Sequence, residues 1–244
     1  MVWCIFALLF GDLILLPVFF QQAHLPQLSA FESGLNMMPQ GIGMLVGFTL
    51  GGKLFNWWGA RLPVGIGMGF VCLGMWQLGR LTPTVDGLTL LPWTLITGLG
   101  FGLALLPVST LALQHLSGAA LAKGNSLYNA TRQIFASLAT TITTSLLVQF
   151  TASNVSELLT NANNISNSPL TNLVASQEIL IITAQAGVTA NNDLFSFMAI
   201  GSLFVLVLAF FLPSRRKLSK VELMEEEVEG MVAVATTYSP GKPV

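Results

Sequence analysis

The chain has 244 residues, of which 53% are hydrophobic and 9% are charged, and its formal net charge is −1. An average soluble domain is about 25% charged, so this composition excludes an ordinary water-soluble domain and favours a surface that faces lipid. The small net charge and the dispersed Lys and Arg residues exclude a basic surface for nucleic acid. The two cysteines, Cys4 and Cys72, lie in apolar runs, and we interpret both as small packing residues.

Six apolar stretches are long enough for transmembrane helices, because a helix needs about 20 mostly apolar residues to cross a hydrocarbon core of about 30 Å. The apolar runs are continuous rather than alternating, which indicates helices rather than the strands of a barrel. We therefore expect an all-α membrane protein, with the spans in residues 1–212 and a tail in residues 213–244. The predicted spans are residues 2–22, 33–54, 62–80, 88–114, 126–150 and 193–212.

The first span carries a carboxylate, Asp12, near the middle of its length. A charged residue at the centre of a spanning helix costs about 2.5–3.5 kcal/mol on insertion scales. Such a cost is tolerated when the group faces a polar cavity or takes up a proton. Our hypothesis is that Asp12 faces a central cavity and binds a proton or a cationic substrate. The alternative is a protonated side chain that hydrogen-bonds a neighbouring helix.

The second span contains a polar group, Gln40, directly after Pro39. A proline inside a helix removes one backbone hydrogen bond and kinks the helix. Gln40 is therefore predicted either to add a polar group to the cavity or to hydrogen-bond the backbone that Pro39 frees.

Glycines recur at every fourth position in the second and fourth spans. This small-xxx-small spacing allows two helix backbones to approach closely in lipid, so we interpret the glycines as helix-packing residues. They are Gly43, Gly47 and Gly51 in the second span and Gly98 and Gly102 in the fourth.

Small and polar residues form a stripe at helical spacing along the fifth span. The functional interpretation is a cavity-lining face with Arg132 near its cytoplasmic mouth. The alternative is that Arg132 extends towards lipid headgroups or bonds loop carbonyls. The stripe consists of Asn129, Arg132, Gln133, Ala136, Thr140 and Thr144.

The longest connection, residues 151–192, is polar and rich in Asn. We predict that it is an extracytoplasmic loop, with residues 170–188 forming an interfacial or docked helix. With six spans, nine of the ten Lys and Arg residues fall on one side of the membrane and Arg80 on the other. We expect the chain to lie in a plasma or inner membrane. Because basic residues remain cytoplasmic, both termini and the tail are expected on the cytoplasmic side.

The connection between the second and third spans resembles the loop signature G-x-L-x-D-x-x-G-x-R of the major facilitator superfamily, which occurs at this place in each six-helix half. Asn56 departs from that pattern, because it stands at the acidic position. Residues 98–107 and 124–133 resemble the fourteen-span drug:proton antiporter branch. The matching loop positions are Gly52, Leu54, Asn56, Gly59 and Arg61.

This resemblance implies the six-helix C-terminal half of a multidrug exporter, coupled to protons and completed by a missing N-terminal half or a second chain. Its expected partners are the bilayer, protons and a small amphipathic substrate. One alternative is a non-transporting, truncated remnant. A membrane-embedded enzyme is less favoured, because His24 and His115 lie at opposite membrane edges and cannot share a metal. We expect neither a cofactor nor a metal.

Overall fold

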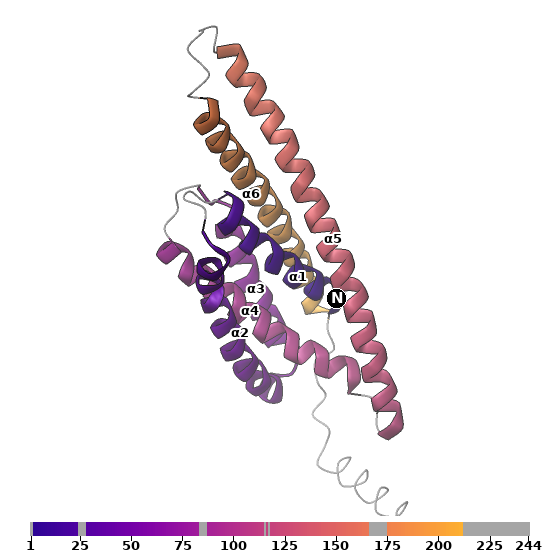
Figure 1. The fold of residues 1–244 in the computed structure, drawn as a ribbon. Coiled ribbons are helices and arrows are strands. Elements are labelled where there is room, and N and C mark those ends of the chain that lie inside the picture. Colours follow the sequence, from indigo (N-terminus) through magenta and orange to yellow (C-terminus); the bar gives the residue numbers. More distant parts are fainter. Residues whose placement is uncertain are drawn as a thin grey trace, which may run out of the picture. The chain divides into compact units, whose positions relative to one another are not determined.

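The computed structural model describes residues 2–23, 28–82, 87–114, 116, 118–165 and 175–211, and all elements within them are helical. The compact unit that holds these residues ends at Leu212. The predicted tail, residues 213–244, lies outside the described residues. The helices are α1 (Val2–Val18), the π-helix η1 (Phe19–Ala23), α2 (Ala30–Trp58), α3 (Arg61–Leu78), α4 (Gly87–Leu113), α5 (Gly118–Ile165) and α6 (Ala175–Phe210) (Figure 1).

The first helix changes its geometry one residue after Pro17, where α1 ends and η1 begins. A proline has no backbone N–H to donate to the carbonyl four residues earlier, so the regular α pattern is interrupted there.

α2 begins with a capping box. The Glu32 N–H donates to Ser29 Oγ over 3.3 Å, and the Ser29 N–H donates to a Glu32 carboxylate oxygen over 2.9 Å. These two bonds fix the start of α2, because they satisfy donors that lack partners within the helix.

Glycine backbones form the contact between α2 and α4, the most extensive helix–helix contact in the described chain. A Cβ placed on Gly47 would lie 2.9 Å from Gly102 Cα, and one placed on Gly51 would lie 3.0 Å from the Leu103 carbonyl oxygen. Side chains at these positions would force the helices apart. The glycines that recur at every fourth position in the sequence therefore lie on the faces that α2 and α4 present to each other.

Two clusters of buried apolar side chains stabilise the bundle. One joins α1, α3, α4 and α6 through residues such as Ile5, Met68 and Phe101. The other surrounds the end of α1 and η1, where Phe19 and Phe20 are fully buried. Together they hold α1 in the interior of the bundle, which is where its single carboxylate lies.

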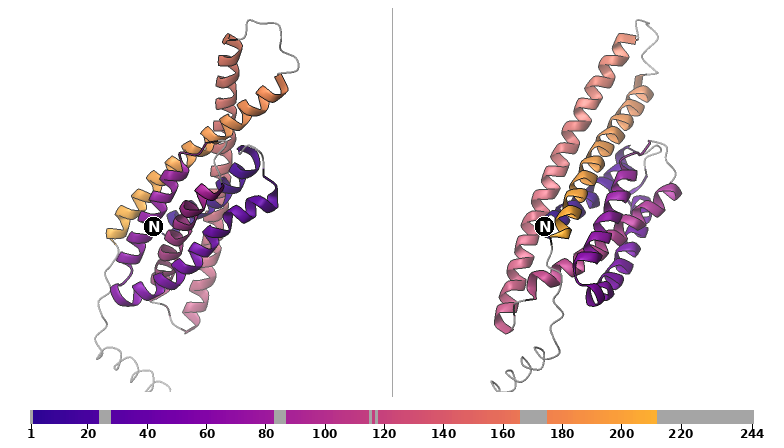
Figure 2. Two further views of the ribbon diagram at one scale, coloured as in Figure 1. Left: turned by 90° about the vertical axis from the view of Figure 1, so that its left-hand side faces the viewer. Right: turned by 180° about the vertical axis from the view of Figure 1, so that it is seen from behind.

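The last two helices are much longer than predicted. α5 begins at Gly118 and continues to Ile165, and α6 begins at Ala175, so the expected loop 151–192 is largely helical. Hydroxyl groups of this polar segment bond to carbonyls of their own helix, as Ser156 Oγ does to the Ser153 carbonyl over 2.8 Å. The polar side chains of this segment therefore do not end α5. Residues 175–188 belong to α6 rather than to a separate interfacial helix. The C-terminal end of α5 and the N-terminal end of α6 extend past the other helices (Figures 1 and 2).

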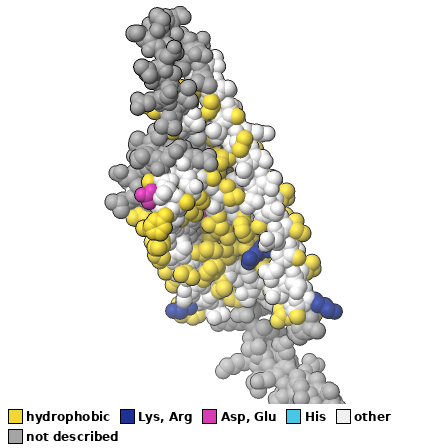
Figure 3. Space-filling view, in the orientation of Figure 1, with side chains coloured by type: hydrophobic (Ala, Val, Ile, Leu, Met, Phe, Trp, Pro, Cys, Tyr) yellow, Lys and Arg dark blue, Asp and Glu magenta, His cyan; other side chains and the backbone are white. Residues whose placement is uncertain are grey.

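Four helices of the described chain are long and apolar enough to cross a membrane: Val2–Gln21, Thr89–Leu113, Ala120–Leu158 and Ile181–Phe210. α2 and α3 match two of the predicted spans in position, but glycines and polar residues make them less apolar, so their crossing stays a prediction. Hydrophobic side chains cover much of the face shown in Figure 3, and charged ones are sparse on it. Large exposed apolar residues on α2 and α5 include Phe31, Met38, Leu45, Leu127 and Ile134.

Candidate functional site

The carboxylate predicted in the first span is fully buried and pairs with the glutamine predicted in the second. Gln40 Nε2 donates a hydrogen bond to Asp12 Oδ2, and Gln40 itself is 5% exposed. The other carboxylate oxygen, Asp12 Oδ1, has no hydrogen-bond partner. The structure thus brings these two candidate residues together and leaves one acceptor atom of the carboxyl group available.

Gln40 is held in place by its backbone as well as by its side chain. It follows Pro39 within α2, and its carbonyl oxygen lies so close to Gly98 of α4 that a Cβ on Gly98 would overlap it. The Asp12–Gln40 bond therefore links α1 to the glycine-lined contact between α2 and α4. A shift of α1 relative to this helix pair would have to break or re-aim the bond.

A cavity of about 300 Å³ lies next to this pair, between α1, α2, α4 and α5. On α1, Leu9 lines it, three residues before Asp12, and on α2, Met44 lines it, four residues after Gln40. Residues three or four apart lie on the same helix face, so the cavity begins about one turn from the buried carboxyl. Its lining is Phe6, Leu9, Phe10, Met44, Phe48, Leu105, Leu106, Ser109, Thr110 and Arg132.

Arg132 is the charged residue of this lining. It is half-buried, and its guanidinium carbon lies 5.3 Å from the centre of the Phe6 ring, within the range of a cation–π interaction. Arg132 therefore lies in the wall of this cavity, and the functional role that we expect for it stays a prediction.

Aromatic rings on both sides of Arg132 join α5 to α1. Trp3 stacks on Phe135 with ring centres 5.2 Å apart and lies 5.6 Å from Tyr128. The Tyr128 hydroxyl also bonds to Ser109 Oγ of α4 over 2.8 Å. Sequence reasoning missed this cluster. The spacing of Trp3 and Phe6 on α1, and of Tyr128 and Phe135 on α5, would have indicated two facing aromatic stripes.

The other stripe residues on α5 do not line this cavity. Asn129 is exposed, and its amide donates to the Asn125 carbonyl over 2.9 Å. Gln133 is exposed, and Thr140 donates to the Ser137 carbonyl over 2.8 Å. The predicted polar face is therefore divided: Arg132 turns towards α1, whereas Asn129 and Gln133 lie on the exposed side of α5.

The loop signature forms the junction between α2 and α3. Gly59 ends α2 with a φ of 80°, and its N–H donates to the Phe55 carbonyl over 3.0 Å. Only glycine adopts this conformation at little cost, which explains why the signature has a glycine there. Arg61 is the first residue of α3, and Asn56 is exposed on the last turn of α2. Gly52 and Leu54 are half-buried on the same helix.

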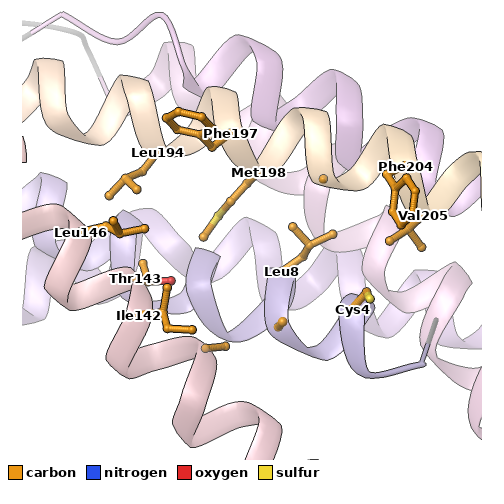
Figure 4. Close-up of a pocket in the computed structure, with 13 residues that line it drawn as sticks. Cys4, Leu8, Ile142, Thr143, Leu146, Leu194, Phe197, Met198, Phe204 and Val205 are labelled. Carbon is orange, nitrogen blue, oxygen red and sulfur yellow. The ribbon is translucent and has the colours of Figure 1, made fainter.

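A second cavity, of about 370 Å³, lies between α1, α5 and α6 (Figure 4). Cys4 and Leu8 of α1, Ile142 and Thr143 of α5, and Met198 of α6 are among the residues that line it. None of the lining residues is charged. The cavity therefore has few groups that could orient a polar molecule.

A further pair of bonds missed by the sequence reasoning joins α6 to the segment after α3. Asn192 Oδ1 accepts from the Leu81 N–H over 3.1 Å, and Asn192 Nδ2 donates to the Leu81 carbonyl over 2.9 Å. The sequence signal is an amide residue in the middle of a helix, because an amide side chain can donate and accept hydrogen bonds at the same time.

The two histidines considered as possible metal ligands, His24 and His115, lie outside the described residues. Within the described part of the chain, no group of three His, Cys, Asp or Glu residues could hold a metal ion.

The Major Facilitator Superfamily profile matches residues 1–140, more than half of the chain. The chain therefore belongs to the major facilitator superfamily, and it is a multi-pass membrane protein.

Several curated proteins are similar to the chain. A "Multidrug resistance protein B homolog" of Mycobacterium tuberculosis is 32% identical over 164 residues, which are 66% of this chain and 29% of that protein. The "Uncharacterized MFS-type transporter YhcA" of Bacillus subtilis is 24% identical over 230 residues, covering 86% of this chain and 43% of that protein. The "Lincomycin resistance protein LmrB" of Listeria innocua is 25% identical over 149 residues, covering 60% and 31%. The chain thus matches less than half the length of each of these relatives.

Proposed function

We propose that this chain is the six-helix C-terminal half of a fourteen-span, proton-coupled exporter of drugs or other small amphipathic molecules. It would lie in a plasma or inner membrane with both termini in the cytoplasm. Two of the similar proteins are named for drug or lincomycin resistance, which supports export of such molecules.

The observation that carries the proton-coupling proposal is the buried Asp12 carboxyl group. One of its oxygens accepts from Gln40, and the other has no partner. A carboxylate in this position is costly as an ion and gains from taking up a proton. Since its one partner is on α2, uptake of a proton would change the interaction between α1 and the α2–α4 pair. Secondary transporters alternate access by rocking one repeat or bundle against the other around a site near the midplane.

Large apolar side chains on α2 and α5 support the proposal that a second half completes the transporter. Leu45 is 68% exposed, Leu127 is 69% exposed and Ile134 is 66% exposed. Such exposed apolar faces need a cover of lipid or of further helices, and we propose that a second half supplies part of that cover. The test is co-purification. We expect transport activity only when the second half is present, whether on the same chain, on another chain or as a second copy. A monodisperse and active six-helix monomer would contradict this part of the proposal.

Proton coupling is tested by a pH-jump efflux assay on vesicles that hold the complete gene product. Asp12→Asn keeps the size of the side chain but cannot exchange a proton, so we expect pH-driven efflux to fall to the background rate. Asp193→Asn is the matched control, because Asp193 is exposed on α6 and should keep the wild-type rate. If Asp12→Asn left both the rate and its pH dependence unchanged, Asp12 would not be the coupling group.

A further inference from the structure

We propose that the cavity beside the Asp12–Gln40 pair, with Arg132 in its wall, is a binding subsite for an aromatic molecule that carries an anionic group. This inference rests on the proposed function in one respect, namely that the transported substrate reaches this cavity. It adds the chemical class of the substrate and the residue that selects it.

The walls of the cavity suit a flat apolar body. Phe6 and Phe10 of α1 and Phe48 of α2 contribute three aromatic rings to the lining, and Met44 of α2 adds a further apolar side chain. Ligand sites are mostly apolar, measure about 300–1,000 Å³ and contain a few polar groups that set the orientation. The cavity, at about 300 Å³, has room for a molecule of one or two fused rings.

The polar groups of the lining leave one strong donor available. The Ser109 hydroxyl donates to the Leu105 carbonyl over 2.7 Å, and the Thr110 hydroxyl donates to the Leu106 carbonyl over 2.9 Å. Both hydroxyl protons are therefore used within α4. The guanidinium of Arg132 lies over the Phe6 ring, and in the described part of the chain no carboxylate pairs with it.

The charge of the lining favours an anion over a cation. Arg132 contributes a positive charge and a planar set of donors that matches a carboxylate in two places, and the lining contains no acidic residue. Asp12 is outside the lining, fully buried and bonded to Gln40. A cation in the cavity would meet Arg132 without a compensating negative group, whereas an anion would pair with it in a partly water-excluded site.

The test uses three naphthalene probes that share one ring system and differ in their substituent: a carboxylate, a neutral carboxamide and a methylammonium group. Their binding to the complete gene product in lipid nanodiscs is measured by isothermal titration calorimetry at pH 7, without any proton gradient. We expect the carboxylate to bind about tenfold or more tightly than the methylammonium probe, the size expected for a charge-assisted hydrogen bond.

Three variants test whether Arg132 causes the preference for the carboxylate probe. Arg132→Gln should remove the preference, and Arg132→Lys should keep part of it because the charge remains. Phe10→Ala should weaken the binding of all three probes alike. Lys123→Gln is the control: it removes a charge from an exposed position of α5 outside the cavity, and should bind all three probes as the wild type does.

The inference is overturned if the methylammonium probe binds the wild type as tightly as the carboxylate, or if Arg132→Gln keeps the preference. Should Arg132→Gln fail to fold, the wild-type preference and the Arg132→Lys variant decide between the outcomes. Because binding is measured without a gradient, loss of coupling in Asp12→Asn would leave this result unaffected. Conversely, active transport without any role for Arg132 would refute this inference alone.

Discussion

At the scale of single residues, the best-defined electrostatic feature outside the membrane spans is the capping box at the start of α2. The Ser29 N–H and hydroxyl both donate to the carboxylate of Glu32, each over 2.9 Å. These bonds favour the charged form, so they lower the pKa of Glu32 below its ordinary value, the backbone donor contributing most. A lowered pKa means that the box adds stability above about pH 4.3, the usual Glu value, and loses it as the pH falls through the lowered pKa.

We predict that Ser29→Ala lowers the free energy of unfolding by about 1 kcal/mol at pH 7, the usual cost of losing an N-cap. It should also bring the pKa of Glu32 part of the way back towards about 4.3, because one of its two donors is lost. Thermal unfolding and NMR titration of the labelled carboxyl group measure these two effects. Ser126→Ala is the control, since the Ser126 hydroxyl bonds within its own helix, to the Ala122 carbonyl. Equal behaviour of the two variants would argue against the capping role.

The sequence was informative about residues whose chemistry conflicts with their surroundings. Asp12 stood out because a carboxylate in an apolar span is costly, and Gln40 stood out because it follows a proline. Their contact could not be predicted, because it depends on the register of α1 against α2. Arg132 was predicted as a cavity residue, but its position over Phe6 follows from the aromatic packing between α1 and α5.

At the scale of helices, the contact between α2 and α4 depends on the absence of side chains. A Cβ on Gly43 would overlap the backbone of Leu95, whereas one on Gly41 would have no heavy atom within 4 Å. Gly43 therefore lies in the close contact between the two helices, whereas Gly41, two residues earlier, lies outside it. The four-residue spacing predicted which of them would face a neighbouring helix.

We predict that Gly43→Ala destabilises the protein by about 1–3 kcal/mol, because the added methyl group must separate two closely packed backbones. Gly41→Ala should leave the stability unchanged or raise it slightly, since alanine favours the helix more than glycine does. Unfolding midpoints in one detergent provide the comparison. Similar losses for both variants would mean that helix flexibility, rather than close packing, accounts for the glycines.

Asn192 is the residue on α6 that holds the segment after α3. We predict that Asn192→Ala costs about 1–2 kcal/mol, because two hydrogen bonds to the Leu81 backbone are lost. Hydrogen–deuterium exchange of the peptide that contains Leu81 should become faster. Thr189→Ala, one turn away at an exposed position of α6, should leave that exchange unchanged. If it accelerated the exchange equally, α6 as a whole would be responsible.

Helix positions were predictable over most of the chain, and helix lengths were not. All six predicted spans coincide with a helix, yet α5 and α6 continue through the segment that its Asn residues assigned to a loop. Polar residues exclude burial in lipid, but they do not exclude a helix when no proline interrupts the backbone. Side-chain hydroxyls such as that of Thr160, which bonds to the Ser156 carbonyl, find partners within the helix itself.

At the scale of the whole molecule, the number of membrane crossings decides how the chain is oriented. Four helices are apolar enough by composition, and α2 and α3 would add the remaining two crossings. The resemblance to the loop signature predicts six, because that signature occurs between the second and third spans of each six-helix half. The orientation of every later segment depends on whether these two glycine-rich helices cross.

We predict that single cysteines at Trp58 and Ser156, both exposed, react with an impermeant maleimide from opposite sides of the membrane. The background would carry Cys4→Ala and Cys72→Ala. Three crossings separate the two positions if α3 spans the bilayer, and two if it does not. A cysteine at Ala30 should react from the side opposite to Trp58 if α2 spans. Labelling of Trp58 and Ser156 from the same side would show that α3 does not cross.

The length of α5 has a practical consequence. At 1.5 Å per residue, its 48 residues extend over roughly 70 Å, more than twice the hydrocarbon thickness of about 30 Å. A rod of this length amplifies a small tilt at its base into a larger displacement at its tip. A nitroxide spin label in place of Ser153, which is exposed on this outer part of the helix, would therefore report any tilting of α5 during the proposed transport cycle. The label would leave the buried bundle unaltered.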